Sequence, residues 1–310
     1  MLPLLGWALK DVQWSAVRTA VGRLGSWQII VLVAINVVTL LSFSGRWWLI
    51  LRRQGCRIPF LTLAGYRTAS FGVSYFTPGP QFGGEPLQIY LLTRNHSIST
   101  PTATAATAVD KVLEVGINFL FLTVGGVVMS YGFLGAARGE SEIGIWNVGI
   151  GLAIVGILTV VLAAFLVAEW FGWRPLGRLA ARLPGRIALT VADSEKLVAH
   201  FFREQPRTVL AAMGVSVLSW GLILFEYWLS MAFLGLNLTP MQLLTAVTIN
   251  RLAFLAPLPG GLGALESSQV LAMTALGLDP AIGISQSLII RARDVATGLT
   301  GLGIGWRAAR

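Results

Sequence analysis

The chain has 310 residues, of which 55% are hydrophobic and only 12% are charged, and its mean hydropathy is +0.72. Soluble domains carry about 25% charged residues, so this composition excludes a soluble globular protein and indicates an integral membrane protein. Lys and Arg outnumber Asp and Glu by 23 to 14. Cytoplasmic loops of membrane proteins carry such an excess, so it does not require a nucleic-acid partner. Cys56 is the single cysteine, which excludes an intrachain disulfide and a cysteine-based metal site.

The N-terminal residues 1–26 mix apolar and basic side chains. Tryptophan and valine recur at helical spacing between Trp7 and Val21, with basic residues between them. This pattern is typical of an amphipathic helix at a membrane surface. We predict an interfacial segment over residues 1–26 and a single transmembrane domain over residues 27–310.

Long apolar runs predict the spanning helices. The first covers residues 27–51, and Arg46-Trp47-Trp48 followed by Arg52-Arg53 resembles an aromatic and basic interfacial anchor at its end. Four later runs are also long enough to span, since about 20 apolar residues cross a bilayer. They cover residues 101–131, 144–168, 208–234 and 281–306.

Two shorter apolar segments, 62–77 and 239–257, each run into a stretch rich in proline and glycine. These stretches cannot continue a helix, because proline lacks the N–H group and fixes φ, while glycine adds backbone freedom. Broken backbone at membrane depth is tolerated where it is buried in protein or lines a wet cavity. We therefore predict two re-entrant hairpins, helix–break–helix units that enter the membrane and leave on the same side. The break residues are Pro78, Gly79, Gly83, Gly84, Pro257, Pro259, Gly260, Gly261 and Gly263.

The two breaks are related by an offset of 181 residues. The offset matches Pro78 with Pro259, Glu85 with Glu266 and Asp110 with Arg291. Three predicted helices cross between the hairpins, an odd number, so the second hairpin enters from the opposite face. The predicted fold class is thus an all-α, polytopic membrane protein with an inverted repeat, an arrangement that transporters use to build a site at the midplane.

Charge counting predicts the orientation. With re-entrant hairpins, residues 46–61, 94–100, 169–207 and the C-terminus share one side, which holds fourteen Lys and Arg against four Asp and Glu. The other side holds four of each sign. The positive-inside rule places the first side in the cytoplasm. We expect a multi-pass protein of the cell membrane whose basic segment 169–207 and C-terminus are cytoplasmic.

Charged residues inside the apolar segments are the candidate site. A charge at a lipid-facing helix centre costs about 2.5–3.5 kcal/mol, so such residues must face inward, pair, or lie near an interface. Asp110 and Glu114 share a helix face and need a nearby cation. Arg291 and Asp294 are three residues apart on one helix, so they can pair locally. The candidate substrate-binding or translocation residues are Arg67, Glu85, Asp110, Glu114, Arg251, Glu266, Arg291 and Asp294.

The remaining intramembrane charges, Lys111, Glu226 and Arg293, are interpreted as snorkelling or structurally paired. Arg251 and Arg291 are expected to hold a phosphate, because arginine binds phosphate in a bidentate fork and broken helices leave N–H donors at their N-termini. No zinc-protease motif, catalytic triad, P-loop or dinucleotide fingerprint is found. We therefore predict no catalytic residue, no metal ligand and no cofactor.

Together these motifs resemble the lysylphosphatidylglycerol synthase transmembrane region, the flippase-like family also called UPF0104. The resemblance rests on Gly83-Gly84-Glu85-Pro86-Leu87-Gln88, Ala108-Val109-Asp110-Lys111, Asn250-Arg251, Pro259-Gly260-Gly261-Leu262-Gly263, and Arg291 with Asp294. Full-length synthases of this kind add a soluble aminoacyltransferase domain. Nothing after Arg310 supplies one, so we do not expect this chain alone to aminoacylate lipid.

The resemblance and the site chemistry favour a membrane lipid translocase for an anionic phospholipid or a lipid-linked precursor. The expected partners are therefore membrane lipids with an anionic headgroup or a lipid-linked phosphate, and no nucleic acid. Two alternatives remain open. In the first, the chain is a membrane component of lipid modification, such as phosphatidylglycerol lysyltransfer or glycosyl transfer, and works with a lipid-modifying enzyme as its partner. In the second, it is a proton-coupled transporter of small solutes.

Overall fold

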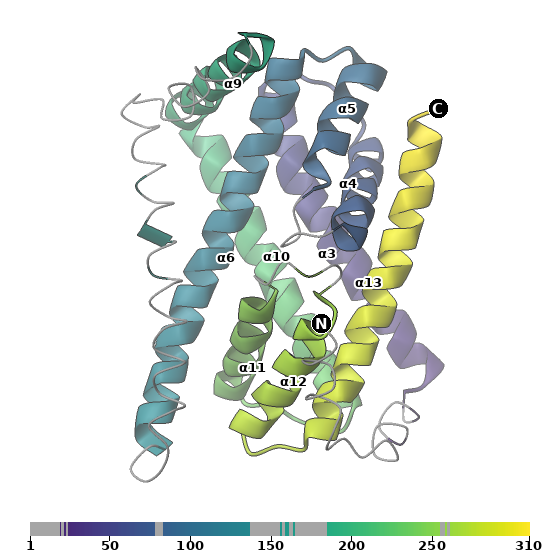
Figure 1. Cartoon of the computed structure of the whole chain (residues 1–310), viewed down its shortest axis with the longest axis vertical. Coiled ribbons are helices and arrows are strands. Elements are labelled where there is room, and N and C mark those ends of the chain that lie inside the picture. Colours follow the sequence, from purple (N-terminus) through teal and green to yellow (C-terminus); the bar gives the residue numbers. More distant parts are fainter. Residues whose placement is uncertain are drawn as a thin grey trace.

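The computed structural model describes residues 24–77, 83–136, 185–254 and 261–310, together with single positions at 19, 22, 156, 159, 160, 164 and 258. Over these ranges the chain is helical and contains no strand (Figure 1), which confirms the predicted all-α class. The helices of the first half are α3 (Ser26–Arg53), α4 (Phe60–Phe76), α5 (Glu85–His96) and α6 (Thr100–Ala136). Those of the second half are α9 (Gly185–Glu204), α10 (Pro206–Phe233), α11 (Pro240–Ala253), α12 (Ala264–Ala275) and α13 (Pro280–Ala308).

Some predictions lie outside the described residues. They are the interfacial segment 1–26 up to its last residues, nearly all of the span 144–168, the first half of the basic segment 169–207, and the break residues Pro78, Gly79, Pro257, Pro259 and Gly260. The second half of the basic segment is described, and it forms α9.

Proline and short polar side chains set the helix starts. Pro206, Pro240 and Pro280 each begin a helix, where the missing N–H group has no partner to lose. Thr239 caps α11, and Asp279 caps α13 by accepting a 2.8 Å hydrogen bond from the Ala281 N–H group. These signals explain why the predicted boundaries in the second half agree closely with the structure.

Three helices of the described chain are long and apolar enough to cross a membrane. They are α3, the Thr100–Met129 part of α6, and α10. This confirms the predictions for residues 27–51, 101–131 and 208–234 as spanning helices by length and composition. Helix α13 has 29 residues but carries four charged residues, and its role as a span stays a prediction.

The two halves repeat one helix order. Helices α3, α4, α5 and α6 have 28, 17, 12 and 37 residues, and α10, α11, α12 and α13 have 28, 14, 12 and 29. Helix α3 packs on α10, α4 packs on α13, and α11 packs on α6. In each of these contacts, a helix of one half meets a helix of the other half. The pair α4–α5 and the pair α11–α12 lie in opposite halves of the molecule (Figure 1). This arrangement fits the predicted inverted repeat, while entry of the two pairs into a membrane from opposite faces stays a prediction.

Glycines at the first break are required by the backbone. Gly83 has φ +128°, a conformation that L side chains rarely adopt. A Cβ on Gly84 would lie 2.1 Å from the Ser70 carbonyl oxygen, so only glycine allows α5 to start against α4. The break therefore places Glu85 in the first turn of α5.

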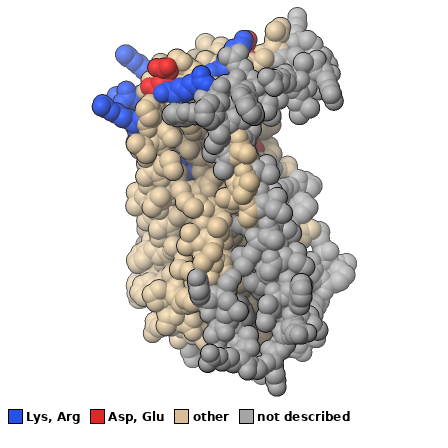
Figure 2. All heavy atoms as spheres, turned by 90° about the vertical axis from the view of Figure 1, so that its left-hand side faces the viewer, with Lys and Arg blue, Asp and Glu red and all other residues tan. Residues whose placement is uncertain are grey.

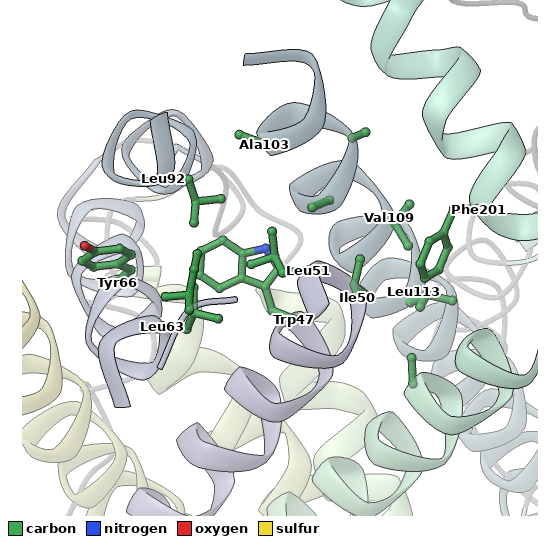
Figure 3. Close-up of a cluster of buried hydrophobic side chains, with 14 of the residues drawn as sticks. Trp47, Ile50, Leu51, Leu63, Tyr66, Leu92, Ala103, Val109, Leu113 and Phe201 are labelled. Atoms are coloured by element: carbon green, nitrogen blue, oxygen red, sulfur yellow. The ribbon is translucent and has the colours of Figure 1, made fainter. Parts of the chain in front are cut away.

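Trp47 belongs to an apolar cluster that joins helices of the first half to α9 and α10. Its side chain is fully buried among Leu51, Leu63 and Leu92 (Figure 3). The sequence pattern predicted an interfacial anchor for Arg46-Trp47-Trp48, and this prediction is wrong for Arg46 and Trp47, which are both fully buried. Helix α3 continues to Arg53, so the exposed end of the helix falls at Arg52 and Arg53 instead.

Basic side chains gather at the end of the molecule that carries α9 (Figure 2). The described residues at this end include Arg52 and Arg53 at the end of α3, Lys196 on α9 and Arg307 on α13. Bringing these segments to one end agrees with the predicted sharing of one side. That this side is cytoplasmic stays a prediction.

Glycine also permits a close contact between the backbones of the two halves. A Cβ on Gly301 of α13 would lie 2.0 Å from the Thr68 carbonyl oxygen of α4. We expect Gly301→Ala to lower the free energy of unfolding by about 1–3 kcal/mol, because the two backbones must move apart. Thermal unfolding of the purified protein in detergent measures this loss.

Gly303 on the same helix provides the matched control. A Cβ there meets no atom within 4 Å. Gly303→Ala should leave the melting temperature unchanged or raise it, since alanine is the better helix former by up to about 1 kcal/mol. Equal melting temperatures for the two variants would contradict close packing of α13 on α4.

Candidate functional site

A cavity of about 600 Å³ lies between the two halves. Its walls come from α3, α4, α6, α10, α11 and α13, together with Glu85 and Gln88 of α5. Sites of this size commonly hold small-molecule ligands. The charged side chains that line the cavity are Arg67, Glu85, Asp110, Lys111, Glu114, Glu226, Arg251, Arg293 and Asp294.

One wall of the cavity holds a carboxylate cluster on α6, formed by Asp110 and Glu114. Arg46 donates from Nε to Asp110 Oδ1 at 2.6 Å and from Nη2 to Glu114 Oε2 at 3.0 Å. Arg67 of α4 bridges the same two carboxylates. The predicted need for a nearby cation is therefore met twice. Arg46 also donates to Ser216 Oγ at 3.1 Å, which ties α3 and α6 to α10.

Glu85 joins this cluster from the start of α5. Its carboxylate pairs with the Lys111 ammonium at 3.0 Å, and Lys111 also contacts Glu114 at 3.1 Å. Glu85 additionally accepts a 2.8 Å hydrogen bond from the Gly83 N–H group, while the Gly84 N–H donates to Ser74 Oγ at 2.9 Å. Two N–H groups before α5 are thus satisfied by protein side chains. Lys111 is therefore structurally paired, which is one of the two roles, snorkelling or structural pairing, that the sequence predicts for it.

A second ion-pair cluster links α10 to α13. Arg293 donates to Glu226 of α10 at 2.7 Å and to the adjacent Asp294 at 2.9 Å. The predicted partner of Asp294 was Arg291, and the structure corrects this. Residues 291 and 294 share a face of α13, but Arg291 donates to Glu266 of the neighbouring helix α12.

Glu266 and Arg291 form a separate pair that does not line the cavity. Arg291 donates from Nε at 2.9 Å and from Nη2 at 2.6 Å to one carboxylate oxygen of Glu266. The other oxygen accepts from the Gly263 N–H at 2.9 Å. The pair repeats the arrangement of Glu85, Lys111 and Gly83 in the first half. It fastens α12 to α13, whereas Glu85 faces the cavity.

Arg251 differs from the other cavity cations. Its guanidinium carbon lies 4.9 Å from the ring centre of Trp220, and Trp220 stacks on Phe121 with ring centres 4.0 Å apart. Among the described residues it has no carboxylate within ion-pair distance, and its Nε is buried without a hydrogen-bond partner. Arg251 is therefore held by an aromatic face while its charge stays available to an anion.

Sequence reasoning missed Arg46, which it counted among loop charges. The signal that could have found it is its place inside an apolar run, six residues before the Arg52-Arg53 pair. The structure places Arg67, Glu85, Asp110, Glu114, Arg251 and Asp294 around one cavity, and it places Glu266 and Arg291 outside that cavity.

The fold and the cavity define a polytopic α-helical membrane protein that encloses paired charges between two helix repeats. The chain belongs to the family described as the lysylphosphatidylglycerol synthase TM region, which matches residues 2–301. It is 20% identical over 284 residues to a UPF0104 membrane protein of Methanothermobacter thermautotrophicus, covering 85% of this chain and 80% of that protein. It is 22% identical over 279 residues to a UPF0104 membrane protein of Pyrococcus horikoshii, covering 85% and 81%. The resemblance predicted from the motifs is confirmed.

Proposed function

We propose that this protein is a lipid translocase that moves a phosphate-bearing lipid, an anionic phospholipid or a lipid-linked precursor, between the leaflets of the cell membrane. The proposed orientation has α9 and the C-terminus in the cytoplasm. The observation that carries the proposal is Arg251, a partly buried cation that lines a cavity of about 600 Å³ without a carboxylate partner among the described residues. A lipid phosphate supplies the anion that this guanidinium lacks.

The other cavity charges support binding rather than bond chemistry. Each carboxylate that lines the cavity is in an ion pair with arginine or lysine: Glu85, Asp110, Glu114, Glu226 and Asp294. A carboxylate held in this way is a poor general base, because its lone pairs are occupied and the ionised form is favoured. A polar path through an apolar bundle is what a headgroup needs in order to cross while its acyl chains stay in lipid.

Arg251→Gln provides the test of the proposal. In proteoliposomes with labelled phospholipid, we expect this variant to reduce the initial rate of headgroup movement at least about tenfold, the loss of a charge-assisted contact worth about 1.5–3 kcal/mol. Arg53→Gln, an exposed change at the end of α3, should keep the wild-type rate. An Arg251→Gln variant that is folded and moves lipid at the wild-type rate would remove Arg251 from the pathway.

The lipid-modifying alternative predicts a different product. A membrane enzyme for lysyl or glycosyl transfer would produce a new lipid species in cells that express the chain, whereas a translocase changes only the distribution between leaflets. Mass spectrometry of total lipid, together with leaflet-specific labelling, separates the two functions.

A further inference from the structure

One end of the cavity carries polar groups without formal charge, from Tyr227 and Ser230 on α10 and Gln286 on α13. We infer that these groups form a subsite for hydroxyl groups, so that the substrate is a phosphate-bearing lipid whose headgroup is a polyol or a sugar. The inference rests on the proposed function, because it assigns part of the same cavity. It adds the chemical class of the headgroup beyond the phosphate.

Gln286 supplies an unpaired acceptor. Its side chain lines the cavity, and the residue is only 2% exposed. Its Nε2 donates to Ser230 Oγ at 2.6 Å, and Ser230 Oγ donates to the Tyr227 carbonyl oxygen at 2.9 Å. These bonds fix the orientation of the amide. The amide oxygen, Oε1, then has no hydrogen-bond partner among the described residues. Buried acceptors are rarely left unpaired, so this oxygen calls for a donor from a molecule in the cavity.

Tyr227 supplies a second acceptor. The phenol lines the cavity, and its O–H donates to Gln269 Oε1 at 2.7 Å. Gln269 is fully buried in α12 and accepts the hydrogen bond from the phenol, so the phenol proton is not available to another acceptor. The Tyr227 oxygen is left with lone pairs, so it accepts rather than donates. Two acceptors, from two helices, thus face one end of the cavity.

A hydroxyl is the donor that this end suits best. An ammonium group would be drawn to a carboxylate, but the nearest carboxylates along these helices, Glu226 and Asp294, are held by Arg293. Tyr227 follows Trp220, on which Arg251 lies, by seven residues, about 10 Å along the axis of α10. A phosphate at Arg251 joined to a polyol or sugar ring covers both positions, whereas a bare phosphate covers only the first.

The test compares three lipids that share a diacylglycerol phosphate. Phosphatidylinositol carries ring hydroxyls, phosphatidic acid carries none, and phosphatidylethanolamine carries an ammonium group. Binding to the purified full chain in detergent is measured by native mass spectrometry with each lipid alone. We expect the wild type to bind phosphatidylinositol about three- to tenfold more tightly than either of the other two, as expected for one or two neutral hydrogen bonds.

Two variants remove the acceptors separately. Gln286→Leu and Tyr227→Phe should each lose most of the preference for phosphatidylinositol while the affinity for phosphatidic acid stays the same. Tyr227→Phe keeps the ring and its packing, so it tests the subsite even if Gln286→Leu fails to fold. Ser287→Ala is the control, because Ser287 is buried beside Gln286, bonds to Ile284 O of its own helix, and does not line the cavity.

Equal wild-type affinity for phosphatidylinositol and phosphatidic acid would overturn the inference, as would a preference for phosphatidylethanolamine. Equal weakening of all three lipids by both variants would also overturn it. Binding is measured without a bilayer to cross, so the two proposals fail separately. A preference for phosphatidylinositol without movement in vesicles refutes translocation alone, and movement without such a preference refutes the hydroxyl subsite alone.

Discussion

Arg46→Leu is expected to lower the free energy of unfolding by about 3–5 kcal/mol, the cost of leaving buried charges without their partner. Arg46 is fully buried and contacts Asp110, Glu114 and Ser216. After its removal, Asp110 keeps Arg67 as its one ion-pair partner among the described residues, while Glu114 keeps Arg67 and Lys111. The two carboxylates then repel each other more strongly in a low-dielectric site. A loss of this size is a large part of the stability of most domains.

Thermal and denaturant unfolding in detergent measure this loss, with Arg53→Leu as the matched control. Arg53 lies on the same helix but is exposed, so its change should cost less than about 0.5 kcal/mol. Arg46→Lys should recover only part of the loss, since an ammonium cannot reproduce the guanidinium fork that reaches three acceptors. If Arg46→Leu has the same melting temperature as the wild type, the contacts of Arg46 contribute nothing to the stability of the fold.

The helices and their boundaries were predictable because the causes are local. Apolar runs of membrane length identified α3, α6 and α10. The predicted starts of α10, α11 and α13 lie close to Pro206, Pro240 and Pro280, the prolines that begin these helices in the structure. The paired breaks were predictable for the same reason, since proline and glycine act on their own backbone. The matched order of helices in the two halves then follows from the offset of 181 residues.

The partners of the charges were not predictable, because they depend on residues far away in the chain. Arg46 meets Asp110 across 64 residues and Ser216 across 170. Read locally, with Trp47 and Trp48 after it, Arg46 matched an interfacial anchor. The predicted pair of Arg291 and Asp294 failed for a related reason. Spacing along one helix suggested contact, whereas packing of α12 against α13 offers Arg291 the carboxylate of Glu266. Asp294 pairs with its neighbour Arg293 instead.

The structure also separates two glutamates that the sequence treats as equivalent. Glu85 and Glu266 each follow a break, accept an N–H bond from a preceding glycine, and pair with a cation on the next long helix. Glu85 lines the cavity, and its side chain is 23% exposed. Glu266 does not line it, and its side chain is 12% exposed. Glu85 and Glu266 should therefore have different roles.

Neutralising each glutamate is expected to give opposite results. Glu266→Gln leaves Arg291 without its carboxylate between α12 and α13 and should cost about 3 kcal/mol of unfolding free energy, with an unchanged rate of lipid movement per folded protein.

Glu85→Gln should cost less than about 1 kcal/mol, because its pair with Lys111 is partly exposed. The substitution removes one negative charge and so raises the net charge of the cavity by one. The lipid phosphate should therefore bind more tightly and leave more slowly. We expect the rate of headgroup movement in proteoliposomes to fall about tenfold, equivalent to about 1.4 kcal/mol in the barrier, while the melting temperature stays near that of the wild type. Matching losses of stability and rate in the two variants would show that both glutamates only fasten helices, and that the cavity charge does not control release.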